Sequence, residues 1–301
     1  MISIIIPTYN QRGFLTDAIN SALSQSYQDV EVIVVDDNNP DTDARAKTEQ
    51  LMAVYADNPK VRYLKHEHNK NGSAARNTGF KASKGEFIAF LDDDDYWNPE
   101  KLERQLAYLQ THPQYDAVYT YIIVNGAQNP NNCYEGNIVV EYLTNKVSLQ
   151  TSCLLFTRKA VETINGFDES FKRHQDYEFL IRYFFAGFRM GCLPEYLSYM
   201  NSVGGNRLSG TQLNELKARF LQIFDSQLNY LEKQKKGTKK TIIVANYVKN
   251  FESHVASKNY KLAWGIFKNY FPMAPFVFIS QCAMLLKNSI KRKLSKRRNI
   301  N

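Results

Sequence analysis

The chain has 301 residues with four cysteines and a formal net charge of +8 at pH 7. This length suits one large α/β domain, or a domain of about 200 residues with an appendage. The four cysteines are far apart in the sequence and form no C-x-x-C pair. We therefore expect neither a zinc knuckle nor a disulfide framework, and we expect a reducing compartment.

The positive charge gathers at the C-terminal end of the chain. From Lys287 onward there are seven Lys and Arg residues and no acids, so the rest of the chain carries a net charge of only +1. This distribution disfavours a nucleic-acid-binding protein. The apolar stretch 276–286 before this tail is too short and too interrupted to span a membrane. Stretch and tail together predict either a peripheral membrane contact or an ordinary packed helix with a basic end.

Strand and helix signals alternate along the first half of the chain. The first apolar run, residues 2–6, is stopped by Pro7 and has no basic segment before it, which favours a strand over a signal peptide. Further strands are expected at residues 31–35, 61–65, 86–91, 116–121 and 153–157, with helices at 14–23, 41–55, 99–110 and 177–186. Alternation of this kind predicts a mostly parallel sheet covered by helices.

The character of the chain changes to helical beyond residue 210. Apolar residues recur at helical spacing over residues 213–231 and again over 244–255. We expect an α/β catalytic domain over residues 1–210 and a helical C-terminal region over 211–301, which includes the basic tail.

The apolar strand that ends at Leu91 runs directly into four consecutive carboxylates, Asp92 to Asp95. Two carboxylates about 5 Å apart repel by roughly 3 kcal/mol at an effective dielectric near 20. Such a cluster calls for a cation, and oxygen-only ligands suit Mg²⁺ or Mn²⁺. A turn, or the cap of the helix that starts near residue 99, accounts for one of these acids, which we take to be Asp95, but not for all four.

Polar groups also follow the first two expected strands, at residues 7–10 and 36–38. Ligands of open parallel sheets bind beyond the carboxyl ends of the strands, so these groups and the acid cluster should share one crevice. Asp36 either accepts hydrogen bonds from a nucleoside or starts the turn at residues 38–41. The chain has no G-x-G-x-x-G and no P-loop motif, which disfavours a dinucleotide oxidoreductase or an NTPase.

Seven short motifs follow one another over residues 2–190. They are IIIPTYN (4–10), SQSY (24–27), EVIVVDD (31–37), AARNTG (74–79), GEFIAFLDDDD (85–95), GFDE (166–169) and QDYEFLIR (175–182). With these motifs in this order the chain closely resembles family 2 of the nucleotide-sugar glycosyltransferases. The resemblance implies a GT-A fold, in which a Rossmann-like, mostly parallel sheet is flanked by helices.

The same resemblance implies a donor site. Its donor contacts are the following side chains: Pro7, Tyr9, Asp37, Arg76, Asp92 and Asp93. Asp94, as the second acid of the family's Asp-x-Asp motif, is the implied ligand of a divalent cation, Mn²⁺ or Mg²⁺. For Arg76 the alternative is a salt bridge into the acid-rich crevice.

Asp176 corresponds to the family's general base, which takes the proton of the acceptor hydroxyl. The residue before it is Gln175, where the family has an acid, and this departure removes one negative charge beside the base. The alternative role for Asp176 is to cap the helix at residues 177–186. His174 is either an acceptor contact or a surface histidine.

The implied function is inverting transfer of a sugar from a nucleotide-sugar donor, a UDP-sugar in our prediction, to a glycan or glycolipid hydroxyl in surface polysaccharide biosynthesis. We expect a cytoplasmic protein at the inner face of the cell membrane. Gly204 and Gly205 suggest a lid in which Arg207 reaches the diphosphate, with a plain linker as the alternative. The alternative functions are a nucleotidyltransferase and a non-catalytic sugar-nucleotide-binding protein of the same fold.

Overall fold

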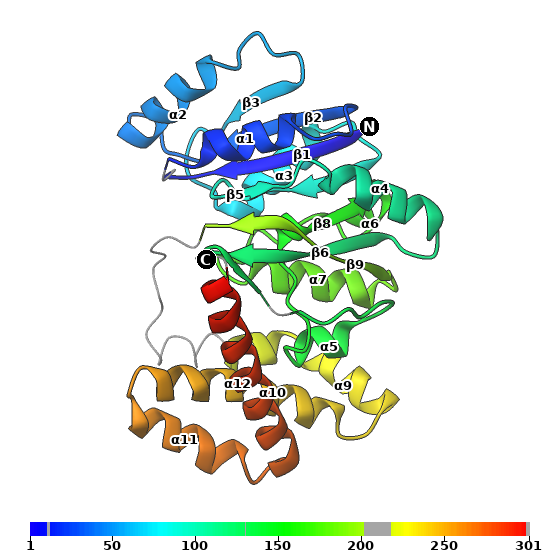
Figure 1. The fold of residues 1–301 in the computed structure, drawn as a ribbon, viewed down its shortest axis with the longest axis vertical. Helices are drawn as coiled ribbons and strands as arrows, with labels where there is room; N and C mark the ends of the chain where they lie inside the picture. Colours follow the sequence, from blue (N-terminus) through cyan, green and yellow to red (C-terminus); the bar gives the residue numbers. More distant parts are fainter. Residues whose placement is uncertain (11–12, 130, 202–217, 299–301) are drawn as a thin grey trace. The chain divides into compact units, whose positions relative to one another are not determined.

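The computed structural model describes residues 1–10, 13–129, 131–201 and 218–298, and the side chains of residues 292–298 lie outside the description (Figure 1). The chain divides into two compact units. The first comprises residues 1–126, 133–138 and 149–202, and the second comprises 127–132, 139–148 and 203–301. The predicted boundary at residue 210 lies outside the described residues and stays a prediction.

The first unit is built on a mixed sheet (Figure 1). Its strands are β1 (Ile2–Thr8), β2 (Val30–Asp36), β3 (Val61–Lys65), β4 (Phe87–Phe90), β5 (Asp95–Trp97), β6 (Ala117–Val124), β8 (Leu154–Thr157) and β9 (Met190–Met200). They run in the order β3-β2-β1-β4-β8-β6-β9-β5. β3 pairs with β2, β2 with β1 and β1 with β4, all parallel, and β6 also pairs parallel with β9. β8 pairs antiparallel with β4 and β6, and β5 pairs antiparallel with β9. The predicted α/β class is confirmed, and β5 and β9 are strands that we did not predict.

Helices cover both faces of this sheet. They are α1 (Leu15–Leu23), α2 (Asp43–Ala53), α3 (Gly72–Ala82), α4 (Lys101–Thr111), α6 (Arg158–Thr163) and α7 (Gln175–Phe185), with a 3-10 turn at Thr151–Cys153. Alternate side chains of β1 and β2 pack with α1 and α4 on one face, whereas Ile33 and Val35 of β2 pack with Ala75 of α3 on the other. Sequence periodicity predicted every helix of this list except α3 and α6.

Helix α3 was missed because it contains two glycines and a largely polar sequence, which weaken its helical pattern. The close packing of the helix on the sheet explains one of these residues. A Cβ atom on Gly79 would come within 3.2 Å of Val35 and would also overlap Ile5. Only glycine therefore lets α3 lie this close to β1 and β2, and the same approach brings the N-terminal end of α3 to the strand ends.

The carboxyl ends of β1, β2 and β4 meet at one edge of the sheet. Thr8 pairs with Asp36 in the parallel register of β1 and β2, and Leu91 donates its backbone N–H to the carbonyl of Ile5 at 3.0 Å. β1 lies between β2 and β4, so the strand order reverses here. A reversal of this kind opens a crevice for ligands in α/β sheets.

The second unit is largely helical. Its elements are β7 (Ala127–Gln128), α5 (Val139–Leu143), α9 (Asp225–Gln234), α10 (Thr238–Ala256), α11 (Tyr260–Tyr270) and α12 (Pro275–Arg298). Val244 and Val248 of α10 pack against Ile266 of α11 and Phe278 of α12 in a separate apolar core. Among the described residues, none of the helices has the length and hydropathy needed to span a bilayer.

Cys133 and Cys192 form a disulfide within the first unit, so our prediction of no disulfide is wrong. The two residues are 59 positions apart in the sequence, yet their Cα atoms are only 5.6 Å apart. The pairing of β6 with β9 places Cys192 opposite Tyr119, and the Tyr119 hydroxyl hydrogen-bonds to the backbone of Tyr134 beside Cys133. Sequence spacing carries no information about such a contact, because the sheet register creates it.

Candidate active site

A cavity of about 230 Å³ lies at the carboxyl ends of β1, β2 and β4. It is lined by Pro7, Thr8, Tyr9, Asp37, Gly72, Ala75, Arg76, Asp92, Asp93, Asp94 and Gln175. The structure thus brings all the predicted donor and metal residues into one cavity, although they come from four separate segments of the chain. The N-terminal end of α3 at Gly72 forms part of the wall, and a helix N-terminus favours a phosphate group.

The acid cluster is divided between the cavity and the interior. Asp93 is held by the Thr8 hydroxyl, which donates to Asp93 Oδ2 at 2.6 Å. Burial raises the pKa of Asp93 to about 7, the Thr8 hydrogen bond opposes this rise, and the neighbouring acids add to it. Asp92 and Asp94 also line the cavity. A site with so many carboxylates at one place is poised to attract a cation.

Asp95 differs from the other three acids. It is the first residue of β5 and is only 2% exposed, and helix α4 begins six residues later at Lys101. Of the two roles expected for Asp95, the helix cap is wrong, because Glu100 occupies the N-cap position, whereas the turn is present, since the Asp95 N–H donates to the carbonyl of Asp92 at 3.0 Å. Burial and the charge of Asp92 raise the pKa of Asp95 to about 8.

Arg76 joins the acid cluster to helix α7. Its guanidinium donates to Asp92 Oδ1 at 2.5 Å and to Gln175 Oε1 at 2.8 Å, and it lies over the ring of Phe167 at 5.3 Å from the centroid. The salt bridge that we considered as the alternative role is thus present. Arg76 also lines the cavity, so the two roles coexist in one side chain.

Asp176 lies in the first turn of α7, directly after Gln175. Since α7 begins at Gln175 with His174 at the N-cap position, Asp176 is inside the helix and is not its N-cap. Burial raises the pKa of Asp176 to about 6, while the positive charge of Arg76 lowers it and the charge of Asp92 raises it. Asp176 therefore lies within electrostatic reach of Arg76 and Asp92 of the cavity, although it is not itself among the residues that line the cavity.

Asp37 organises the loop between β3 and α3. Both carboxylate oxygens are used, since Asp37 accepts hydrogen bonds from the His66 ring at 2.7 Å, the Asn69 side chain at 2.8 Å, and the backbone N–H groups of Lys70 at 2.7 Å and Asn71 at 2.9 Å. This loop and Tyr9 line a second cavity of about 380 Å³ that also includes Asp37. Sequence reasoning missed His66 and Asn69, because neither belongs to a recognised motif.

Asp36 is fully buried and serves the turn, not the cavity. It accepts hydrogen bonds from the Tyr63 hydroxyl at 2.5 Å and from the Asn38 side chain at 2.8 Å, and it pairs with Arg45 at 3.2 Å. Of the two roles considered for Asp36, the structure therefore supports the turn.

The comparisons with known proteins agree with this geometry. The sequence pattern of a family described as "Glycosyl transferase family 2" matches residues 3–189, which is well over half of the chain. The chain belongs to glycosyl transferase family 2. The matched range contains every residue of the cavity described above, together with Asp176.

Several family 2 relatives have similar sequences. A glycosyltransferase of Rickettsia conorii, whose function is uncharacterized, is 31% identical over 61% of this chain and 31% of its own length. The amylovoran biosynthesis glycosyltransferase AmsB of Erwinia amylovora is 30% identical over 67% of this chain and 69% of its own. Chondroitin synthase of Escherichia coli is 30% identical over 60% and 26%. The chain spans only 30% to 58% of the length of three rickettsial relatives.

Solved structures share the fold. Residues 1–349 of TarS from S. aureus, in complex with UDP-GlcNAc, superimpose with a TM-score of 0.64 at 19% sequence identity, covering 99% of this chain and 90% of that one. The full-length TarS structure gives a TM-score of 0.62 and is covered over 54% of its length. This likeness confirms the predicted GT-A fold of the family 2 chain.

The family 2 site holds no ready-made cage for a metal. Among the described residues, no group of three or more His, Cys, Asp or Glu side chains is placed to enclose an ion. Mg²⁺ is commonly bound through only one or two carboxylates, with substrate phosphates completing the shell. The carboxylates of Asp92 and Asp94 at the cavity wall fit that arrangement, so the donor set suits a hard divalent cation.

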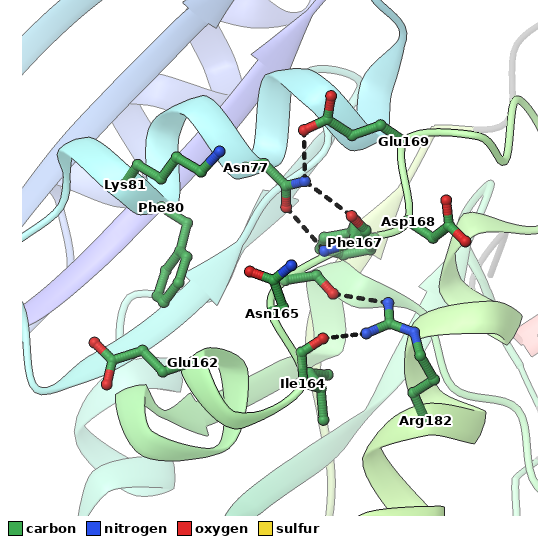
Figure 2. A pocket seen from close by; sticks show the side chains of 11 residues that line it. Asn77, Phe80, Lys81, Glu162, Ile164, Asn165, Phe167, Asp168, Glu169 and Arg182 are labelled. Atoms are coloured by element: carbon green, nitrogen blue, oxygen red, sulfur yellow. Dashed lines mark hydrogen bonds between the residues drawn. The ribbon is translucent and has the colours of Figure 1, made fainter.

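The loop before α7 is fastened to α3 by Asn77 (Figure 2). The Asn77 amide donates to the Phe167 carbonyl at 2.8 Å and to Glu169 Oε1 at 2.9 Å, and it accepts the Phe167 N–H at 2.8 Å. These residues line a third cavity of about 510 Å³, where Arg182 also holds the carbonyl of Gly166 at 2.7 Å. The helix that carries Arg76 and the helix that carries Asp176 are thus joined through this loop.

This fastening predicts a strict requirement for glycine at position 166. Gly166 has φ +63°, and a Cβ atom there would overlap Asn77 Oδ1. We expect Gly166→Ala to lower the free energy of unfolding by about 3 kcal/mol, since positive φ costs roughly 1–2 kcal/mol and the lost Asn77 contacts add to it. Chemical denaturation measures this. Gly187→Ala is the matched control, because Gly187 has φ +91° with nothing within 4 Å of its added Cβ. Equal losses in the two variants would show that Asn77 does not fasten the loop.

The proposed lid at Gly204, Gly205 and Arg207 of the family 2 chain falls within residues 202–217, which the structure does not describe, so it stays a prediction. His174 is described, and its ring lies against Tyr177 at 5.5 Å between centroids. That contact is local to the start of α7 and does not decide whether His174 contacts the acceptor or is a surface histidine.

Proposed function

We propose that this chain transfers a sugar from a UDP-sugar to a hydroxyl group of a glycan or lipid-linked acceptor, with inversion at the anomeric carbon. The observation that carries the proposal is the bridge made by Arg76. Its guanidinium contacts Asp92 of the acid cluster and Gln175, the residue next to Asp176. The Arg76 guanidinium thus connects the acid cluster, which suits a diphosphate with its cation, to the segment that carries Asp176, the proposed base.

The residues of the chain account for a single displacement. Asp176 removes the proton of the acceptor hydroxyl, the oxygen forms a bond to the anomeric carbon, and the bond from that carbon to the diphosphate oxygen breaks. Arg76 and the N-terminal end of α3 provide positive charge beside the cavity where the diphosphate departs. A divalent cation held by Asp94, when bound, neutralises further charge on the leaving diphosphate.

The donor assignment is supported by the similarity to a solved structure and by the position and volume of a cavity. TarS, whose fold this chain shares, has a structure in complex with UDP-GlcNAc. The cavity beside Tyr9 and Asp37 continues from the acid cluster and has a volume suited to a nucleoside. Polysaccharide synthesis is supported by the names of the relatives AmsB and chondroitin synthase.

A cytoplasmic location is part of this proposal, because UDP-sugars are the proposed donors. In a reducing compartment Cys133 and Cys192 would be held as thiols at the 5.6 Å Cα separation that the fold imposes. Neither cysteine is among the residues that line the donor cavity.

Ligand-induced stabilisation tests the donor and the cation together. A nucleotide present at 100 times its Kd stabilises the folded state by about 2.7 kcal/mol, which raises the Tm by roughly 5–10 °C in a chain of this size. We expect this shift with UDP and UDP-sugars in the presence of Mn²⁺ or Mg²⁺, and a much smaller shift after chelation with EDTA. GDP, ADP and dTDP serve as matched nucleotides. A larger shift with one of them, or an unchanged shift in EDTA, would contradict the donor or the metal assignment respectively.

A further inference from the structure

The outer face of α12 exposes a continuous apolar stripe. Phe276 is 90% exposed, Ile279 57%, Leu286 63% and Ile290 50%, and Ala283 between them is also exposed. These five positions are spaced alternately by three and four residues, so they form one line along the helix. A line of large apolar side chains exposed to solvent is typical of a surface that binds a protein, a membrane or another ligand.

The opposite face of α12 fixes the orientation of this stripe. Phe278 and Gln281 are buried, and the Phe278 ring meets those of Phe251 and Phe267 at 5.3 and 5.7 Å between centroids. The helix cannot turn its outer face inward without breaking this packing. The stripe therefore stays available to a partner while the helical core remains intact.

The charges beside the stripe identify the kind of partner. Lys287 and Lys291 are exposed and adjoin Leu286 and Ile290, and the chain from Lys287 onward has seven basic residues and no acid. Two copies of this helix paired in parallel along the stripe would place positive charge against positive charge. An antiparallel pair would set the lysines against residues 275–286 of the other copy, which contain no acid to offset their charge. A surface rich in negative charge fits instead, and lipid headgroups combine that charge with an apolar layer beneath.

We propose that the outer face of α12 binds the surface of an anionic membrane. Its apolar stripe lies among the lipid headgroups, and Lys287 and Lys291 lie against lipid phosphates. The helix lies in the plane of the membrane surface and does not cross the bilayer. This contact goes beyond sugar transfer, and it would hold the enzyme where a lipid-linked acceptor is found.

Vesicle sedimentation of the full chain tests the proposal. We expect binding to vesicles of phosphatidylcholine with phosphatidylglycerol, and at least tenfold weaker binding to phosphatidylcholine alone. Since each basic residue near an anionic surface contributes about a fivefold gain in affinity, Lys287→Glu with Lys291→Glu should weaken binding roughly 25-fold or more. Phe276→Ser with Leu286→Ser should weaken it at least tenfold as well.

Matched variants distinguish binding through this face of α12 from binding through exposed charge or apolar side chains elsewhere in the chain. Lys235→Glu with Lys236→Glu makes the same charge change on an exposed loop, and Val54→Ser with Ile223→Ser removes exposed apolar side chains elsewhere. Both controls should bind anionic vesicles as the unchanged chain does. Equal binding to the two kinds of vesicle would overturn the proposal. So would a chain that ignores vesicles and sediments as a dimer that Leu286→Ser disperses, because the stripe would then be a self-association surface.

Discussion

Replacing Asp176 with asparagine is expected to lower turnover by about 10²- to 10⁴-fold, the range that a general base contributes. Asparagine has nearly the same shape but cannot accept the proton of the acceptor hydroxyl. Donor affinity should be unchanged, because Arg76, Asp92 and Asp93 keep their contacts. Steady-state kinetics with nucleotide binding measured separately gives both quantities.

A control variant and a pH profile make this result specific to Asp176. Glu162→Gln makes the same carboxylate-to-amide change at an exposed position outside the donor cavity and should leave turnover unchanged. Since the pKa of Asp176 is raised to about 6, the carboxylate is protonated below that pH, and turnover should fall about tenfold per pH unit there. The Asp176→Asn variant should lose this acid limb. Turnover within threefold of the unchanged chain would refute the assignment of the base.

Replacing Arg76 with methionine is expected to damage both stability and activity. The change leaves the carboxylate of Asp92 without its ion-pair partner. Breaking a buried pair costs about 3–5 kcal/mol, and we expect about 3 kcal/mol here because Asp92 is one-third exposed. Arg76 lowers the pKa of Asp176, so its loss should move the acid limb of turnover to higher pH. Chemical denaturation and the pH profile measure the two effects.

Two comparisons separate the charge of Arg76 from its shape. Arg76→Lys keeps the charge but cannot contact Asp92 and Gln175 together as the planar guanidinium does, so the acid limb should stay near its original pH while the KM for the donor rises. Arg104→Met removes an exposed arginine that pairs with Glu100 and Glu195, and it should cost far less stability than Arg76→Met, because exposed ion pairs are screened by water. If Arg76→Met were no more destabilising than Arg104→Met, or kept the original acid limb, the bridging role would be wrong.

Much of the fold follows from patterns that act locally in the sequence. The apolar runs of β1, β2 and β4 predicted buried strands, because three to five consecutive apolar residues between turn signals favour a buried strand. Amphipathic spacing likewise predicted α1, and the start signal at residues 98–100 predicted α4. Helix α3 escaped prediction because Gly79, which weakens a helix locally, is required by its contact with Ile5. There the packing of the tertiary structure outweighs the local preference.

The candidate site shows the same division. Asp92 to Asp95 were singled out by their charge density, and the structure places the first three at the cavity. Asp95 has the same side chain and the same neighbours in sequence, yet it is buried at the start of β5. A turn separates Asp95 from the other three acids, because its backbone N–H donates to the carbonyl of Asp92 at 3.0 Å as β5 begins. Charge density alone does not distinguish the four acids, and only the resemblance to family 2 assigned Asp92 to Asp94 to the ligand.

The amino-acid sequence by itself determined the class of this protein: its motifs identify family 2, and its apolar periodicity specifies an α/β sheet and a helical C-terminal region. Only the tertiary structure decided which residues meet. The contact of Arg76 with Gln175, the disulfide between Cys133 and Cys192 and the exposed stripe of α12 each depend on segments far apart in the chain. Local propensity acts over a few residues, whereas these contacts arise from sheet register and from which helix face is buried.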